Sequence, residues 1–314
     1  MDWTKTAFVF PGQGSQTVGM GADFAQTYPE ARAVFEQADD ILGLTFSKIC
    51  FEGPEAELND TANTQPALYI CAIAILRALQ KERPDAQPAY LAGHSLGEFT
   101  ALTAAGALSF EDGLRLVRQR AELMRDAGKT SPGAMAATLG IDAATLRDVC
   151  REASEETGGT LVVANDNCPG QGVISGDQDT LAVGVEKAKA AGAKRVMKLA
   201  VSIAAHSPLM ESASEALVKS LRETTFKPPT IPVIGNVSAS PLNTVEAIHD
   251  ELSQQLTQSV RWSESMQTMI AAGVEDFIEL GPKEVLSGML KWIDRSKGRH
   301  SINSVEKLQA FLSN

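Results

Sequence analysis

Metal-binding and disulfide patterns of cysteine are missing from this chain. Its four cysteines, Cys50, Cys71, Cys150 and Cys168, include no C-x-x-C pair. Their spacing suits neither a zinc site nor a disulfide framework. We therefore expect reduced thiols that pack as small apolar residues, no bound metal, and a cytoplasmic location.

Long hydrophobic runs and an excess of positive charge are missing too. The chain has no stretch of about 18 uninterrupted apolar residues, so we expect no membrane span. Residues 1–5 lack the charged-then-apolar layout of a signal peptide. The net charge is −11, whereas general nucleic-acid binding needs a basic surface. We expect neither a membrane nor a nucleic acid as partner.

What is present is an ordinary globular composition, 44% hydrophobic and 21% charged over 314 residues. Apolar runs alternate with helical spacing, which is typical of a mostly parallel sheet covered on both faces. Residues 129–200 instead follow the order strand, helix, strand, strand, helix, strand of the ferredoxin-like motif. We predict a large α/β-hydrolase-like domain, residues 1–128 and 201–314, with a small ferredoxin-like subdomain, 129–200, inserted in it.

The sequence also predicts the structure of individual segments. Apolar runs predict strands at 6–10 and 89–92. The polar stretch 59–66 predicts a loop before an apolar helix at 67–79. After a strand at 276–280, the remaining chain is predicted to be helical.

One short segment carries the pattern of a nucleophilic serine. In Gly93-His94-Ser95-Leu96-Gly97 an apolar strand runs into a turn and then a helix. Such an elbow lifts the serine hydroxyl out of the sheet, and its glycines let strand and helix cross closely. The alternative is a serine that only caps the helix.

The loop after the first predicted strand raises the possibility of a nucleotide-binding site. Gly12-x-Gly14 follows the first strand, as in dinucleotide-binding proteins, but the third glycine of that fingerprint would fall at Thr17. We therefore do not expect nucleotide binding there.

A serine nucleophile needs a base, and the chain has four histidines. His94 adjoins the serine and is expected to point away from its hydroxyl. His249 and His300 lie in polar segments and are expected at the surface. His206 remains by elimination. No carboxylate partner is evident, and the order of true α/β-hydrolases, serine then acid then histidine, is not followed.

Arg120 shares one side of a predicted helix with Val117, Ala121 and Met124. A surface arginine is the ordinary interpretation. If the side chain points inward, it could bind a carboxylate with two hydrogen bonds.

Seven segments along the chain form an ordered set of motifs: 10–16 (FPGQGSQ), 63–67 (NTQPA), 93–98 (GHSLGE), 119–120 (QR), 164–171 (ANDNCPGQ), 206–210 (HSPLM) and 281–282 (GP). Taken together, these motifs resemble malonyl-CoA:acyl carrier protein transacylases and the related acyltransferase domains of polyketide synthases. The resemblance covers nearly the whole chain.

The resemblance implies a role for each matched position. Ser95 would form the acyl-enzyme, His206 would act as base and then acid, and Arg120 would hold the malonyl carboxylate. Gln13 and the backbone N–H of Leu96 would form the oxyanion hole. The further positions implied are Gln255, whose backbone carbonyl would orient the histidine, and Asn165 and Gln171, near the acyl and CoA path.

Malonyl-CoA and acyl carrier protein are the partners that the resemblance implies, with no cofactor, and we expect a monomer. Because carrier proteins are acidic, we expect a basic dock at Lys194 and Arg195; a solvated helix end is the alternative. Ala204 and Ala205, where the family commonly has Pro-Ser, bear on the acyl group accepted. Rival functions are a stand-alone polyketide synthase acyltransferase, a serine thioesterase or hydrolase, and a non-catalytic carrier-binding module.

Overall fold

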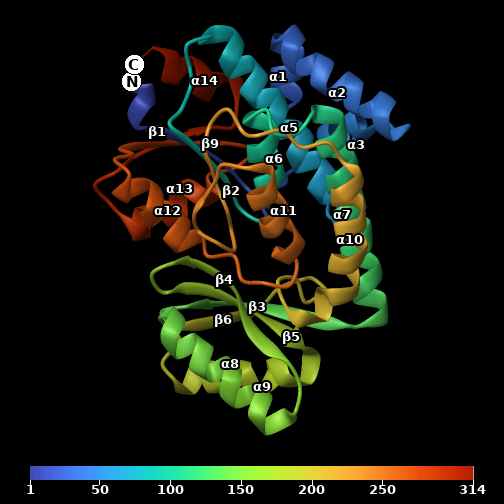
Figure 1. Cartoon of the computed structure of the whole chain (residues 1–314), viewed down its shortest axis with the longest axis vertical. Helices are drawn as coiled ribbons and strands as arrows, with labels where there is room; N and C mark the ends of the chain where they lie inside the picture. The colour runs from blue at the N-terminus through green and yellow to red at the C-terminus, as the bar shows by residue number, and fades with distance from the viewer. Residues whose placement is uncertain (314) are drawn as a thin grey trace.

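A computed structural model describes residues 1–313 and places them in two sheets with helices around them (Figure 1). Among these residues the larger sheet has six strands in the order β10-β9-β1-β2-β7-β8. They are β1 (Thr6–Phe10), β2 (Tyr90–Gly93), β7 (Val233–Ile234), β8 (Pro241–Leu242), β9 (Asp276–Leu280) and β10 (Gly298–Ile302). Strand β8 is antiparallel to β7, and the other pairings are parallel.

Helices cover both faces of this sheet because its central strands are apolar on both sides. In β1, Phe8 and Phe10 pack into one core, whereas Ala7 and Val9 pack into the other. Helices α12 (Trp262–Ala271) and α13 (Val285–Ile293) cover the Ala7 face. The core on the Phe8 side is built by buried side chains of α1 (Ala22–Thr27), α2 (Pro29–Leu42), α3 (Phe46–Glu52), α4 (Glu55–Leu58), α5 (Thr61–Glu82), α6 (Gly97–Ala104), α7 (Phe110–Thr130), α10 (Glu211–Glu223), α11 (Val245–Gln254) and α14 (Val305–Leu312). Two 3-10 turns, η1 (Trp3–Lys5) and η2 (Pro208–Met210), complete the large part.

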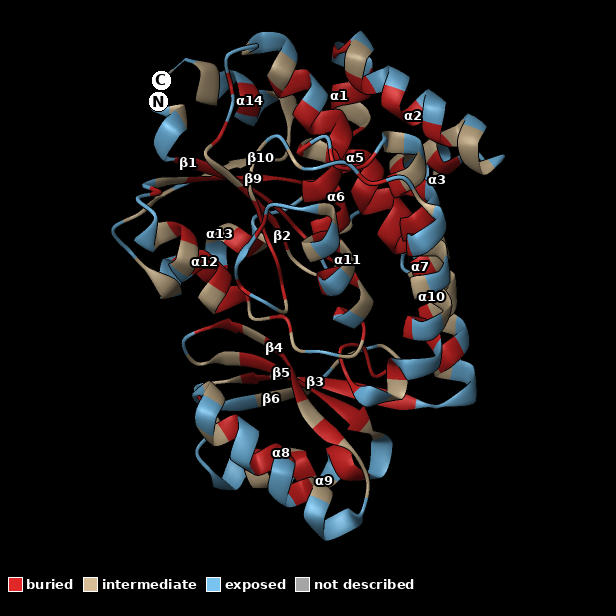
Figure 2. Ribbon diagram, viewed as in Figure 1, coloured by how far each residue is buried: buried red, intermediate tan, exposed pale blue. Residues whose placement is uncertain are grey.

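The second sheet is antiparallel and has the order β4-β5-β3-β6. Its strands are β3 (Gly133–Leu139), β4 (Leu161–Cys168), β5 (Gln171–Asp177) and β6 (Arg195–Lys198). Helices α8 (Ala143–Thr157) and α9 (Gln178–Ala190) cover its outer face, at the bottom of Figure 1. The outer sides of these two helices are exposed, whereas α5 and α6 are almost wholly buried (Figure 2).

The inner face of the second sheet meets the large part. Met135 and Val173 pack into the main core, whereas Ala134 and Ala136, on the opposite face, pack under α8 and α9. Backbone hydrogen bonds join the two parts: Asp166 N–H donates to Val260 O at 2.9 Å, and Val260 N–H donates to Ala164 O at 2.8 Å.

The predicted fold class is confirmed: a mostly parallel sheet and a separate sheet of ferredoxin-like order are both present. The second sheet and its two helices fall within the predicted range 129–200, and the domain boundaries themselves stay a prediction. No helix within residues 1–313 combines the length and hydropathy needed to cross a bilayer.

The prediction of a loop over residues 59–66 was wrong, because α5 begins at Thr61 and contains Pro66. Asp60 caps the helix by accepting a hydrogen bond from Ala62 N–H at 2.8 Å. Pro66 has no N–H for the carbonyl of Ala62, four residues earlier. Arg118 Nη1 donates to that carbonyl instead, at 2.9 Å, so the helix continues through the proline.

Two further predictions need correction. The C-terminal part is not all helical, because β10 pairs with β9 in parallel. His300 lies in this strand, half-buried and 3.1 Å from Asp276, rather than on an open surface. An edge strand of mixed polarity has no clear period, and this explains why β10 was missed.

Between β2 and α6 the strand and helix cross so closely that side chains cannot fit. A Cβ at Gly93 would collide with the carbonyl of Gly97, and a Cβ at Gly97 would collide with the carbonyl of Phe10. The two glycines of the elbow are therefore needed for backbone packing.

We expect Gly93→Ala to prevent folding, with a loss of more than about 4 kcal/mol, because backbone atoms cannot move aside cheaply. Gly288→Ala is the matched control: this glycine is exposed in α13 and its Cβ would meet nothing within 4 Å. There we expect unchanged or slightly raised stability. Thermal melting followed by circular dichroism measures both, and a stable Gly93→Ala protein would contradict the crossing.

Candidate active site

The serine and histidine singled out from the sequence lie in direct contact. Ser95 Oγ is 2.9 Å from His206 Nε2, and His206 Nδ1 is 2.7 Å from the backbone carbonyl of Gln255. A carbonyl can only accept, so Nδ1 carries the hydrogen and Nε2 presents its lone pair to Ser95. The imidazole is therefore oriented to take a proton from the hydroxyl.

Both residues sit in a strained backbone conformation. Ser95 has φ 53° and His206 has φ 57°, the left-handed region that non-glycine residues avoid. Each such residue costs about 1–3 kcal/mol and persists only where its surroundings hold it. In this conformation the two side chains face each other. Strained residues of this kind cluster at active sites.

Asn236, just after β7, clamps the elbow. Its Oδ1 accepts from Ser95 N–H at 2.7 Å, and its Nδ2 donates to the carbonyl of Gly93 at 2.7 Å. Asn236 is buried, and its bond to the carbonyl of Gly93 lies away from water. They hold the two ends of the turn that carries the serine.

Arg120 points inward from α7 and is only 1% exposed. Its Nη1 donates to Gln65 Oε1 at 2.6 Å, and its Nη2 donates to Ser95 Oγ at 3.0 Å and to Gln255 Oε1 at 2.9 Å. Its Nε has no hydrogen-bond partner within residues 1–313. A guanidinium has five N–H groups, so the hydrogen of Nε and one hydrogen of Nη1 have no acceptor within residues 1–313.

Burial shifts the pKa values of the cation and the imidazole in the same direction. It lowers the pKa of Arg120 to about 10, and the negative charge of Glu98 opposes that shift. It lowers the pKa of His206 to about 3, with a further contribution from the positive charge of Arg120. His206 is therefore neutral near pH 7, the state that a general base requires.

A cavity of about 480 Å³ opens in front of these groups. Its walls come from both parts of the molecule: the loop after β1, the elbow and α7 on one side, and β3, β4 and β5 on the other. Gln13, Leu96 and Asn165 line it, together with Ser95, His206 and Arg120. The backbone N–H of Leu96 lies at the start of α6, where helix amides lack intrahelical partners.

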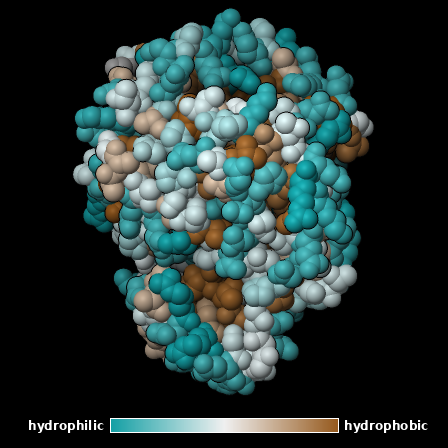
Figure 3. Space-filling model, in the orientation of Figure 1, coloured by the Kyte–Doolittle hydropathy of each residue, from teal (hydrophilic) through white to brown (hydrophobic). Residues whose placement is uncertain are grey.

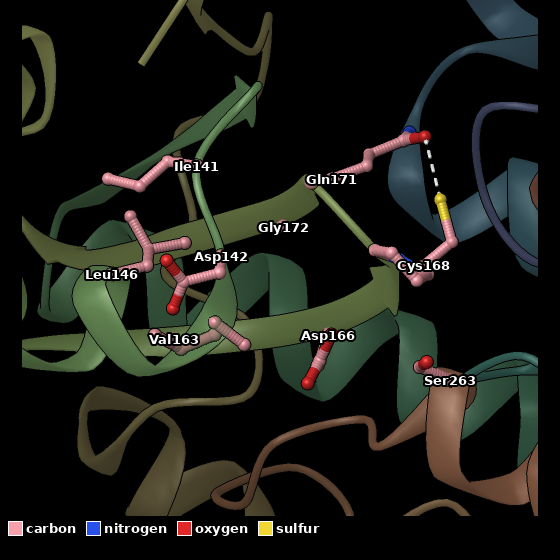
Figure 4. Close-up of a pocket in the computed structure, with 12 residues that line it drawn as sticks. Ile141, Asp142, Leu146, Val163, Asp166, Cys168, Gln171, Gly172 and Ser263 are labelled. Carbon is pink, nitrogen blue, oxygen red and sulfur yellow. Dashed lines mark hydrogen bonds between the residues drawn. The ribbon is translucent and has the colours of Figure 1, made fainter. Parts of the chain in front are cut away.

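A second, smaller pocket of about 210 Å³ lies at the tip of the β4–β5 hairpin and the start of α8 (Figure 4). Gln171 lines this pocket and not the cavity at Ser95, and its Oε1 faces Cys168 Sγ at 3.5 Å. On the face drawn in Figure 3, apolar side chains show in a hollow over the second sheet.

Three polar residues of this site were given no role from the sequence: Gln65, Glu98 and Asn236. Gln65 was inside a matched motif, and a glutamine next to an apolar helix is a weak signal. Glu98 is a charged residue in an otherwise apolar, alanine-rich helix, and it is completely buried. Asn236 offered no signal, since it is a single polar residue after a short strand.

Lys194 and Arg195 lie apart from the serine site, exposed just before and at the start of β6. Neither lines the cavity at Ser95. His94 is half-buried at the cavity wall, and its Nε2 is 2.9 Å from Asn167 Oδ1, so it points away from the hydroxyl as expected.

Residues 7–308 match the model of the acyl transferase domain family. The chain belongs to this family. It is 42% identical over 309 residues to the malonyl CoA-acyl carrier protein transacylase of Escherichia coli K12, covering 98% of this chain and 99% of that one. It is 44% identical to the protein of the same name from Bacillus subtilis, covering 98% and 96%.

Solved structures of the family have the same fold. An acyl-carrier-protein S-malonyltransferase from Burkholderia pseudomallei is 43% identical, with a TM-score of 0.95 over 99% of this chain and 100% of that one. A malonyl-transacylase solved in complex with a type II PKS acyl-carrier protein is 38% identical, with a TM-score of 0.95 over 99% of each chain.

We expect His206 to stay neutral far below the usual histidine range, because burial and Arg120 disfavour the imidazolium. Nitrogen NMR of histidine-labelled protein should show no protonation of His206 between pH 7 and about pH 4.5. A midpoint for His206 near 6.5 would contradict the geometry.

Proposed function

We propose that this chain transfers a malonyl group from malonyl-CoA to the phosphopantetheine thiol of acyl carrier protein, by a ping-pong reaction through an acyl-enzyme on Ser95. The observation that carries the proposal is the 3.0 Å contact between Arg120 Nη2 and Ser95 Oγ. A carboxylate held by this guanidinium lies next to the attacking oxygen. A short acyl group with a terminal carboxylate, such as malonyl, suits that spacing.

In the first half-reaction His206 Nε2 takes the proton of Ser95 as Oγ attacks the thioester carbon. The carbon–sulfur bond then breaks, and the CoA sulfur leaves with the proton from the imidazolium. The carbonyl of Gln255 accepts from Nδ1–H throughout and stabilises the positive imidazole. The product is a malonyl ester on Ser95.

In the second half-reaction the carrier's thiol gives its proton to His206 and attacks the ester carbon. The carbon–oxygen bond breaks, and Ser95 Oγ takes the proton back. This chemistry needs no cofactor and no metal. The tetrahedral oxyanion of each half-reaction is assigned to Gln13 and the N–H of Leu96, and one such donor is worth about 3 kcal/mol.

Arg120 supplies the preference for malonyl. A buried cation with unused donors gains a charge-assisted partner when malonyl enters, whereas acetyl leaves it as it was. A thioesterase for neutral acyl groups would gain nothing from a buried arginine beside its nucleophile. The names of the relatives, malonyl CoA-acyl carrier protein transacylases, support the same substrates.

The alternative of a polyketide-pathway acyltransferase shares this chemistry and differs only in the carrier. The relative solved with a type II PKS acyl-carrier protein keeps it open. A cytoplasmic location and a monomeric state, expected from the sequence, remain part of the proposal.

Intact-mass spectrometry after mixing with malonyl-CoA tests the acyl-enzyme. The native chain should gain one malonyl group that peptide mapping places on Ser95, and Ser95→Ala should gain none. Arg120→Ala should lose malonyl labelling by about 100-fold, because a charge-assisted pair is lost. Acetyl labelling should persist in that variant. Equal loss of both would contradict the role of Arg120.

Carrier docking is assigned to Lys194 and Arg195. Both are exposed, whereas Lys187 and Lys189 on α9 already contact Glu156 and Glu186. Two exposed cations beside the cavity-bearing sheet suit an acidic carrier, which needs local attraction because the whole chain carries −11.

Reversing the charge of Lys194 and Arg195 together to Glu should raise KM for carrier protein about tenfold or more. The KM for malonyl-CoA should stay unchanged, since the acyl cavity is untouched. Lys189→Glu is the matched control on the same subdomain. Steady-state kinetics at low salt measure all three, and an unchanged carrier KM in the double variant would remove the assignment.

A further inference from the structure

A buried carboxylate behind the elbow has no part in the proton transfers described above. Glu98 lies in α6, one turn after Ser95, and is completely buried. Its Oε1 accepts from Asn236 N–H at 3.1 Å, and its Oε2 accepts from Gln255 Nε2. Burial and the nearby charge of Glu251 raise the pKa of Glu98, while these hydrogen bonds and Arg120 oppose that shift.

Gln255 connects this carboxylate to the cation. Its Nε2 donates to Glu98 and, at 3.0 Å, to the carbonyl of Ser95. Its Oε1 accepts from Arg120 Nη2 at 2.9 Å. The side chain is therefore fully used, with both hydrogens facing acceptors and its oxygen facing a donor.

Only one orientation of the Gln255 amide fits these neighbours. If the amide were reversed, its oxygen would face the carbonyl of Ser95 and the carboxylate of Glu98. Its NH₂ would then face the guanidinium of Arg120. Every one of the three contacts would become repulsive, and buried polar groups without partners are costly.

We propose that Glu98 is a positioning residue for acyl-group selection: by holding the Gln255 amide in this orientation, it keeps an acceptor on Arg120 and so aims the guanidinium at the acyl group. This inference rests on the proposed malonyl transfer. The chain of contacts runs Glu98, Gln255, Arg120, and it ends on the oxygen of Ser95. Glu98 touches no substrate and exchanges no proton.

Glu98→Gln is the sharpest substitution, because it keeps the shape and removes one acceptor. A glutamine there cannot accept from both Asn236 N–H and Gln255 Nε2, since one of its two terminal atoms is a donor. When the oxygen of the new amide accepts from Asn236 N–H, its NH₂ faces the NH₂ of Gln255, and the Gln255 amide then turns and leaves Arg120. We expect kcat/KM for acylation by malonyl-CoA to fall about tenfold, with acetyl-CoA roughly unchanged.

The matched control is Glu279→Gln. Glu279, in β9, is also buried, and its carboxylate accepts from the backbone N–H groups of Leu286 and Ser287. It has no hydrogen bond to Gln255 or Arg120 within residues 1–313. This variant should lose stability without changing the ratio of malonyl to acetyl acylation, and thermal melts report folding for each protein.

A double-mutant cycle tests whether Glu98 acts through Gln255. Gln255→Met removes the amide and keeps the backbone carbonyl for His206, so it should lower the malonyl-to-acetyl ratio alone. Adding Glu98→Gln to it should cause no further change in that ratio. An unchanged ratio in either single variant, or fully additive losses, would overturn the inference.

The two proposals fail in different ways. If the native chain forms no malonyl adduct, the proposed function is wrong. If the native chain forms the adduct and prefers malonyl over acetyl, yet Glu98→Gln keeps the same ratio while folded, only the positioning role is wrong. Should Glu98→Gln not fold, Gln255→Met decides: an unchanged ratio there overturns the role.

Discussion

The buried guanidinium of Arg120, next to the hydroxyl of Ser95, needs hydrogen-bond acceptors from the groups around it. Arg120 is as buried as the core, so each N–H without an acceptor has a cost of the order of 1–3 kcal/mol. Gln65 from α5, Ser95 from the elbow and Gln255 after α11 supply oxygens from three separate segments. Removing any of them leaves part of a buried charge unmatched, so the packing of α5, α7 and α11 is tied to the geometry of Ser95.

The two residues with strained backbones, Ser95 and His206, are also held by hydrogen bonds from other segments. Ser95 and His206 both occupy the left-handed region, and in each case nearby hydrogen bonds keep the residue there. Asn236 holds the turn at Ser95, and the carbonyl of Gln255 holds the imidazole at His206. Gln255 thus contacts the backbone of Ser95, the imidazole of His206 and the guanidinium of Arg120, and its own amide is held by Glu98. One residue, through its backbone carbonyl and its side chain together, therefore couples the Ser95–His206 pair to the buried cation.

Local patterns were sufficient where a single segment carries the constraint. The elbow at Ser95 follows from two glycines and an apolar strand within five residues, and the ferredoxin-like order follows from six short elements in sequence. The polar stretch 59–66 misled because its helix depends on Arg118, 56 residues away, to satisfy the carbonyl that Pro66 leaves free. Strand β10 was missed because its half-buried edge position produces no regular alternation.

The chain's own residue order determined the fold class, the serine at the bend and the short set of histidines from which His206 emerged. It left open whether Arg120 faces the core or the solvent, and it did not indicate Glu98, Asn236 or the side chain of Gln255. Tertiary structure decided these, because the Glu98–Gln255 contact joins residues 157 positions apart and the Ser95–Asn236 contact joins residues 141 apart. Hydrogen bonds between such distant segments depend on how helices and sheets pack, and no local period encodes that packing.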